Sequence, residues 1–149
     1  MTSALELLRP SAVSRAQAPG AKAVELRALR EAFRRAVVEE ITGPVVTALY
    51  VLVRPDQDPA ARLAVARATA DRAGYSVAKV LVEEAWTEDP GLRPRLAYAL
   101  TAMRQGAIHG LVAASRVDVS PHDGLYEAEL RRLRGAGGFL HLALDEARS

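Results

Sequence analysis

The residues best placed to do chemistry follow an apolar run in the first half of the chain. Val45 to Val53 is almost continuously apolar and rich in β-branched side chains, and the polar segment Arg54 to Asp58 follows at once. Such a run predicts a strand buried on both faces, as in a parallel sheet covered by helices. Ligands of these sheets bind just beyond the carboxyl ends of the strands. We therefore expect the functional site at residues 54–58, which offer cations and carboxylates but no nucleophile.

A second polar segment, Ser115 to Pro121, follows another predicted strand. If the two strands are neighbours, Arg54 and Arg116 lie near each other at the edge of the sheet. Two arginines in that position could bind a phosphate or another anion. Alternatively, the two arginines form salt bridges, for which the candidate carboxylates are Asp56, Asp58 and Asp118. The sequence leaves both roles open.

Other catalytic chemistry has little support in the sequence. The chain has no cysteine, which excludes thiol catalysis, thiolate metal sites and disulfides. The three histidines, His109, His122 and His141, are scattered, so no metal site is predicted. Ser115 and Ser120 are assigned no catalytic role. Neither a Gly-x-Gly-x-x-Gly motif nor a Walker lysine motif is present, so no cofactor is expected.

Size and charge are those of an ordinary globular protein. A chain of 149 residues is long enough for one domain with a hydrophobic core. Its 20 basic and 18 acidic side chains are interleaved, and they form no strong basic cluster for nucleic acid. No apolar run approaches the roughly 20 residues of a membrane span, and Met1 to Pro10 lacks the order of a signal peptide. We expect a cytoplasmic protein.

Residues 1–22 are predicted to form a flexible leader and residues 23–149 a single domain. The domain opens with an amphipathic helix over 24–41, because apolar residues recur along it at helical spacing. This apolar stripe consists of Leu26, Leu29, Phe33, Val37 and Ile41. The stripe packs either on the domain's own core or on a second copy or partner. Contact with DNA is disfavoured because the arginines of this helix alternate with glutamates.

The rest of the chain alternates between strands and helices. Strands are predicted over 47–53, 75–83, 108–114 and 139–144, and helices over 59–73, 92–105 and 121–134. This alternation predicts parallel βαβ units with right-handed crossovers. The fold class is therefore α/β, with three layers and a mainly parallel sheet of about four strands. An acidic cluster surrounds Trp86 and is interpreted as a solvent-exposed loop or, alternatively, as a contact with a partner. It consists of Glu83, Glu84, Glu88 and Asp89.

Five short motifs occur in a characteristic order. They are Tyr50-Val51-Leu52-Val53-Arg54, Asp71-Arg72-Ala73-Gly74-Tyr75, Asp89-Pro90-Gly91-Leu92, Ser115-Arg116-Val117-Asp118-Val119-Ser120-Pro121 and Leu144-Asp145-Glu146. With these motifs, residues 47–146 resemble the N-terminal catalytic domain of serine recombinases, the resolvase and invertase family. The corresponding family motifs read Tyr-x-Arg-Val-Ser, Ala-Gly-Tyr or Ala-Gly-Trp, Arg-Pro-Gly-Leu, Asp-Arg-Leu-x-Arg-Ser-Pro and Leu-Thr-Glu. The resemblance implies a resolvase-like fold.

The resemblance also implies that the catalytic groups have been lost. Members of the family attack a DNA phosphodiester with a serine and neutralise the phosphate with arginines. Arg54 occupies the position of the nucleophile, and Arg116 matches one of the family's arginines. The other matching positions carry side chains that cannot replace those of the family: Leu52, Asp89, Ser115 and Val119. We therefore expect a pseudoenzyme without recombinase activity.

Three functions follow as expectations. The first is a catalytically inactive recombinase-like domain that acts in protein–protein interaction or regulation, with a protein partner or as a homodimer. Because the family domain continues into a long helix and a DNA-binding domain, helix 24–41 is expected to cover the equivalent hydrophobic surface here, within the chain or across a dimer. The second function is DNA binding through arginines. The third is binding of a small anion or nucleotide by Arg54 and Arg116.

Overall fold

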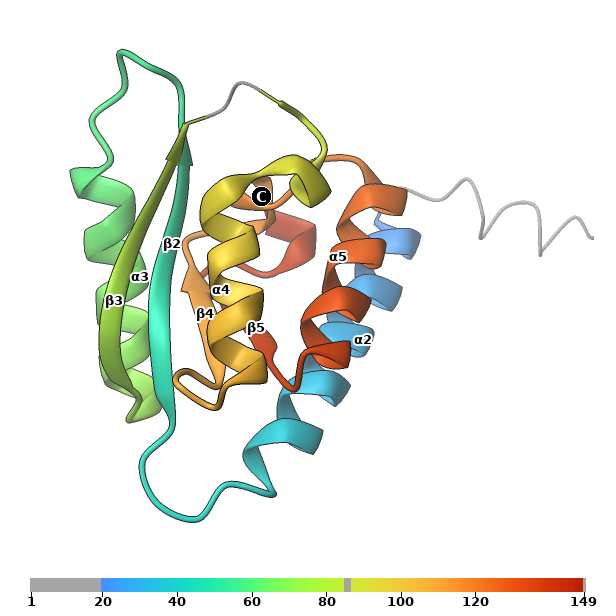
Figure 1. Cartoon of the computed structure of the whole chain (residues 1–149). Helices are drawn as coiled ribbons and strands as arrows, with labels where there is room; N and C mark the ends of the chain where they lie inside the picture. Colours follow the sequence, from blue (N-terminus) through green and yellow to red (C-terminus); the bar gives the residue numbers. More distant parts are fainter. Residues whose placement is uncertain (1–19, 85–86, 149) are drawn as a thin grey trace, which may run out of the picture.

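The computed structural model describes residues 20–84 and 87–148. They form a four-stranded parallel sheet in the order β3-β2-β4-β5 (Figure 1). The strands are β2 (Val46–Val53), β3 (Ser76–Glu84), β4 (Gly110–Ala113) and β5 (Phe139–Leu142). The predicted α/β class with a mainly parallel sheet is confirmed. Trp86 and most of the predicted leader, residues 1–19, lie outside the described residues.

Four α-helices and three 3₁₀ turns accompany the sheet in the described part of the chain. They are α2 (Ala21–Val38), α3 (Ala60–Ala73), α4 (Pro94–Arg104), α5 (Asp123–Gly135), η1 (Pro90–Leu92), η2 (Arg116–Asp118) and η3 (Glu146–Arg148). Helix α3 packs on one face of the sheet, whereas α4 and α5 cover the other face, which gives three layers (Figure 1). Within residues 20–84 and 87–148, no helix is long and apolar enough to cross a membrane.

Several elements begin or end away from their predicted positions. Helix α2 begins inside the predicted leader, because Gly20, with a φ of 84°, turns the chain immediately before it. The predicted helix over 92–105 is divided, because Pro94 opens α4 and holds Arg93 extended at φ −91° and ψ 125°. The strands predicted over 108–114 and 139–144 are shorter, since β4 and β5 contain four residues each.

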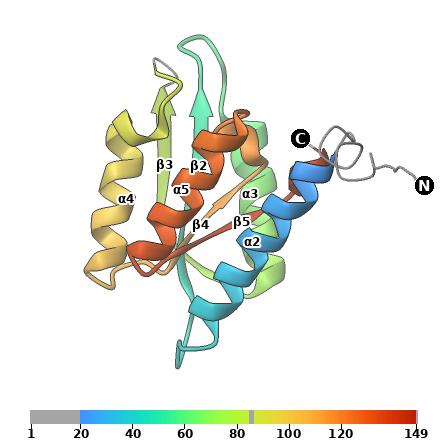
Figure 2. The ribbon, with the colours of Figure 1, turned by 90° about the vertical axis from the view of Figure 1, so that its right-hand side faces the viewer.

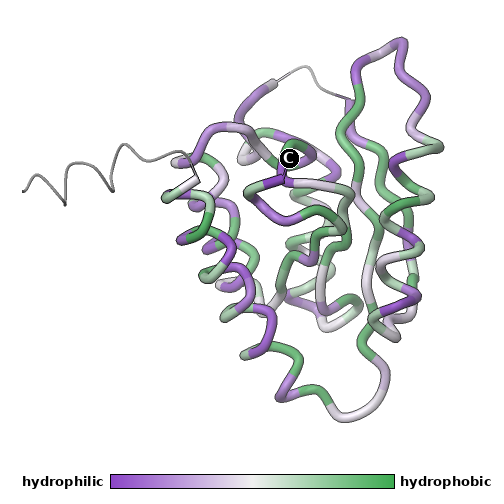
Figure 3. The backbone as a smooth tube through the Cα atoms, turned by 180° about the vertical axis from the view of Figure 1, so that it is seen from behind, coloured by the Kyte–Doolittle hydropathy of each residue, from purple (hydrophilic) through white to green (hydrophobic). Residues whose placement is uncertain are grey.

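Alternating side chains of the strands feed two hydrophobic clusters, one on each face of the sheet. The cluster under α4 and α5 contains Ala48, Tyr50, Leu81, Leu96, Leu111, Leu130 and Leu140. The cluster under α3 contains Leu49, Ala66, Ala70, Val112 and Phe139. Figure 3 shows the strands largely in hydrophobic colours and the loop after β2 in hydrophilic ones. The central strand β2 is therefore buried on both faces, as its sequence predicts.

Helix α2 lies along the β5 edge of the sheet (Figure 2). Leu26 joins the cluster under α4 and α5, whereas Val37 joins the cluster under α3. Leu29 and Phe33 are partly buried against the first of these clusters. Helix α2 ends at Val38, short of the predicted end at Ile41, and Ile41 is partly buried against the second cluster from beyond the helix. The helix thus covers an edge strand and the open ends of both clusters. The predicted stripe is buried within the chain, so a dimer formed through it would require α2 to leave the sheet.

A buried ionic cluster holds α2 in this position. The Arg30 guanidinium donates to both oxygens of the Glu146 carboxylate, at 2.6 and 3.2 Å, and the Tyr126 hydroxyl donates to the same carboxylate at 2.5 Å. The side chains of Arg30 and Glu146 are 3% and 0% exposed. Removing one partner of such a pair costs about 3–5 kcal/mol, because the other charge is left buried alone. The cluster therefore connects the first helix, α5 and the last turn of the described chain.

The Phe139 ring of β5 packs directly over Gly110 of β4 and leaves little room for a side chain there. Gly110 is in register with Phe139, and a Cβ built on Gly110 would lie 2.6 Å from the Phe139 ring. Phe139 is 1% exposed and packs under α3, so its ring has no free space to move into. Gly124, on α5, has no heavy atom within 4 Å of the equivalent Cβ position.

We expect Gly110→Ala to lower the free energy of unfolding by about 1–3 kcal/mol, the usual cost of overpacking a core. Gly124→Ala is the matched control and should leave the protein as stable or raise its stability by up to about 1 kcal/mol, because alanine favours a helix. Urea denaturation of both variants measures the difference. Equal stability of the Gly110 variant and the unsubstituted protein would contradict this packing.

Candidate functional site

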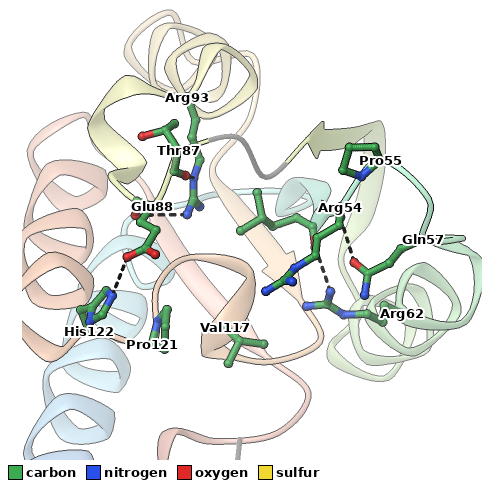
Figure 4. A pocket seen from close by; sticks show the side chains of 11 residues that line it. Arg54, Pro55, Gln57, Arg62, Thr87, Glu88, Arg93, Val117, Pro121 and His122 are labelled. Carbon is green, nitrogen blue, oxygen red and sulfur yellow. Dashed lines mark hydrogen bonds and ion pairs between the residues drawn. The ribbon is translucent and has the colours of Figure 1, made fainter.

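A cavity of about 810 Å³ opens at the carboxyl edge of the sheet. The loops that follow β2, β3 and β4 form its walls, together with the first turn of α3 (Figure 4). The lining residues are Leu52, Arg54, Pro55, Gln57, Arg62, Thr87, Glu88, Arg93, Val117, Pro121 and His122. From β2 the chain first proceeds outward to β3 and then returns to β4 on the other side, so β2 and β4 flank the switch point of the topology. Open α/β sheets bind ligands at such a point.

The floor of the cavity is held by side chains that replace missing strand pairing. β2 pairs with β4 only over Thr47–Leu49, so the backbone of Leu52 has no strand partner on that side. The Leu52 N–H donates to the Asp118 carboxylate at 3.0 Å, and the Arg62 guanidinium donates to the Leu52 carbonyl at 2.9 Å. Arg62 also forms an ion pair with Asp118. These three residues therefore connect α3, the end of β2 and η2.

Asp118 is fully buried at the centre of this arrangement. Its second carboxylate oxygen accepts the Ser115 N–H at 3.3 Å, and the Ser115 hydroxyl caps η2 in return. Burial raises the pKa of Asp118, and the Leu52 N–H and the Arg62 charge offset only part of that effect. Asp118 forms an ion pair with Arg62. Among the described residues, none of the three candidate carboxylates, Asp56, Asp58 and Asp118, forms an ion pair with Arg54 or Arg116.

Arg93 is the most unusual cation of the site. It is 2% exposed, and its guanidinium donates to the backbone carbonyls of Thr87, Asp118 and Glu88, at 3.4, 3.1 and 3.4 Å. It also interacts with the Tyr50 hydroxyl. Among the described residues no carboxylate lies within ion-pair distance of it. The wall of the cavity therefore carries a positive charge that no described carboxylate neutralises. Burying a cation without a counter-charge is unfavourable.

The buried Glu129 of α5 lies close enough to Arg93 to be influenced by its charge. Burial raises the pKa of Glu129, and the charges of Arg132 and Arg93 offset part of that effect. Glu129 nevertheless pairs with Arg132, at 3.1 Å. It therefore does not form the missing counter-charge.

Arg54 supplies a second cation without a partner. Its backbone N–H donates to the Gln57 side chain at 2.8 Å, and its carbonyl accepts the Gln57 N–H at 2.9 Å, which closes a turn after β2. Its guanidinium is exposed and has no bonding partner among the described residues. Figure 4 shows the guanidinium groups of Arg54 and Arg62 on one side of the cavity and that of Arg93 on the other, all directed toward its middle.

Arg116 does not join this group. Strands β2 and β4 are neighbours as predicted, but the 3₁₀ turn η2 directs Arg116 toward α5 instead of toward Arg54. Its guanidinium donates to Asp123 at 2.9 Å and to the Ser120 carbonyl at 3.1 Å, and it lies 4.5 Å from the centre of the Tyr126 ring. The predicted pair of Arg54 and Arg116 is therefore wrong, and a salt bridge with a different aspartate takes its place.

The rim of the cavity carries the remaining polar residues. The Glu88 carboxylate lies 2.9 Å from Nε2 of His122, and both side chains are largely exposed. Asp89 is exposed and accepts the Gly91 N–H at 2.9 Å, which caps η1. Ser115 and Ser120 are buried and bonded to their own turn.

Glu83 corrects the prediction of an exposed acidic loop. It is 2% exposed and accepts the N–H groups of Arg95 and Leu96, at 3.0 and 2.9 Å, and the hydroxyl of Tyr50 at 3.0 Å. A strand carboxylate thus caps the N-terminus of α4. Glu83 therefore already occupies the N-terminus of α4. An anion in the cavity would have to bind the arginines instead.

The histidines have separate structural roles. His109 accepts the Val46 N–H at 2.9 Å, and His141 lies 2.7 Å from the Tyr75 hydroxyl. Burial, followed by the positive charges of Arg34 and Arg30, lowers the pKa of His141 to about 4. Among the described residues no group of three or more His, Cys, Asp or Glu side chains is arranged to hold a metal ion.

Sequence reasoning missed Arg62 and Arg93, although a signal for both is present. Both residues stand at the start of a helix, Arg62 in the first turn of α3 and Arg93 as the residue before α4. The positive end of the helix dipole disfavours cations there, and acidic residues are usual. A basic residue at each of two such starts, on the same edge of a parallel sheet, indicates a site for an anion.

Comparisons of the chain with protein-family models, with curated proteins and with solved structures found no match. The resemblance to serine recombinases therefore stays a prediction that rests on the motifs of this chain. The interpretation of the site depends on its own geometry.

Proposed function

We propose that this chain is a non-catalytic, recombinase-like domain that binds an anionic ligand in the cavity at the carboxyl edge of its sheet. The observation that carries the proposal is Arg93, a buried guanidinium in the wall of the cavity that bonds to carbonyl groups and the Tyr50 hydroxyl but forms no ion pair with a described carboxylate. An anion bound there would provide the counter-charge that the described residues lack. Charge-assisted hydrogen bonds of this kind are about twice as strong as neutral ones.

The absence of suitable catalytic groups around the cavity supports a binding role. Thr87 carries the one hydroxyl among the lining residues, and it accepts the Asp89 N–H at 3.3 Å. His122, the lining residue best suited to act as a base, is paired with Glu88. Arg54 stands where the family has its nucleophile. The lining residues thus offer positive charge for binding but no activated nucleophile.

Inorganic phosphate at matched ionic strength tests the proposal by isothermal titration calorimetry. We expect saturable binding that Arg54→Ala weakens by about tenfold, because one charge-assisted contact is lost. Arg104→Ala is the control. It removes the same charge from the exposed C-terminal end of α4, which lies away from the carboxyl ends of the strands. Equal losses in the two variants would indicate non-specific attraction, and no binding to the unsubstituted protein would refute the proposal.

The sequence-based expectation of a homodimer is the second proposal, and the open edge of the sheet favours it. Strand β3 pairs only with β2, and Val80 and Val82 on it are 45% and 36% exposed. An antiparallel pair of β3 strands with a two-fold axis at Leu81 places Val80 of one copy opposite Val82 of the other. Unpaired edges of this kind readily add a strand.

Light scattering at the highest soluble concentration tests the dimer. We expect twice the mass of one chain, and we expect Val80→Lys to return the mass to that of one chain. Val24→Lys is the control, because Val24 is 63% exposed on α2, at the covered edge of the sheet. A single-chain mass for the unsubstituted protein would exclude this interface.

A further inference from the structure

The charges around the cavity distinguish between classes of anion. Arg62 is neutralised by Asp118, whereas Arg54 and Arg93 have no carboxylate partner among residues 20–84 and 87–148. Two cations without partners match a ligand with two negative charges better than a ligand with one. A phosphomonoester carries about 1.5 to 2 negative charges at pH 7, whereas each phosphodiester of a nucleic acid carries one.

The shape of the cavity favours a compact ligand. Its volume of about 810 Å³ lies within the usual range of small-molecule sites. Besides the arginines, the walls contain Leu52, Pro55, Val117 and Pro121, which offer apolar surface for the organic part of a ligand. The loop that follows β2 brings Pro55, and the segment that follows β4 brings Val117 and Pro121, to opposite sides of the cavity (Figure 4).

The rim of the cavity opposes a long polyanion. The Glu88 side chain is 84% exposed at the entrance, and the neighbouring Asp89 is also exposed. Asp56 and Asp58 are exposed on the loop that carries Arg54. Successive phosphates of a nucleic acid would lie near these carboxylates, whereas a small ligand would enter the cavity with its phosphate between the arginines.

From these observations we propose that the ligand is a compact phosphomonoester in its dianionic form, and not the phosphodiester backbone of a nucleic acid. The phosphate lies between Arg54 and Arg93, with Arg62 available as a further donor. The organic group packs on Leu52 and Val117. This inference rests on the proposed anion-binding function and specifies the ligand of that same cavity.

Two ligands that share one aromatic ring test this inference. Phenyl phosphate is a monoester and methyl phenyl phosphate is a diester, so their main difference at pH 8 is one negative charge. We expect the unsubstituted protein to bind the monoester at least about tenfold more tightly in calorimetric titrations, since one extra charge-assisted contact has that effect. Arg54→Ala should reduce this preference, and Arg104→Ala should preserve it.

The outcomes separate the inference from the function on which it rests. Equal affinity for the monoester and the diester would overturn the dianion assignment and leave the anion-binding function in place. Failure of both esters and of inorganic phosphate to bind would overturn the function and the inference together. Tighter binding of a random DNA duplex than of phenyl phosphate, with a steep loss of affinity as salt increases, would identify a polyanion site and overturn the inference.

Discussion

The site depends on the difference in length between two neighbouring strands. β2 continues beyond the point where β4 stops pairing with it, which leaves the N–H and carbonyl of Leu52 without strand partners on that side. Asp118 and Arg62 replace those partners, and they also form an ion pair with each other. The same mismatch separates the loops that follow β2 and β4, so the cavity opens at the switch point of the sheet.

Most other buried charges in the described chain are neutralised or capped, which makes the exception informative. Glu83 caps α4, and Glu146 pairs with Arg30. Arg116 has the aspartate of α5 and the face of an aromatic ring as partners. Of these three buried arginines, Arg93 is the one that forms no ion pair with a described carboxylate. Because a buried cation without a counter-charge is unfavourable, an anionic ligand in the cavity would stabilise Arg93.

The sequence predicts the sheet better than the site, for physical reasons. Burial on both faces of β2 and the spacing of the helices define a parallel α/β fold before any contact is known. Side-chain directions after a strand depend on the turn that follows, and one 3₁₀ turn sends Arg116 away from the cavity. Arg93 was not identified because it looked like part of a helix, whereas Pro94 places it before that helix.

The most direct test of the account is to observe the arginine side chains while phosphate is added. In ¹⁵N-edited NMR spectra, assigned with single Arg→Lys variants, we predict that the Nε–Hε resonances of Arg54 and Arg93 shift together and saturate. The resonance of Arg116, which is already bonded to Asp123, should stay in place. An Arg93 resonance that does not move at saturating phosphate, or shifts spread evenly over exposed arginines, would contradict the central claim that the cavity holds an anion between these two groups.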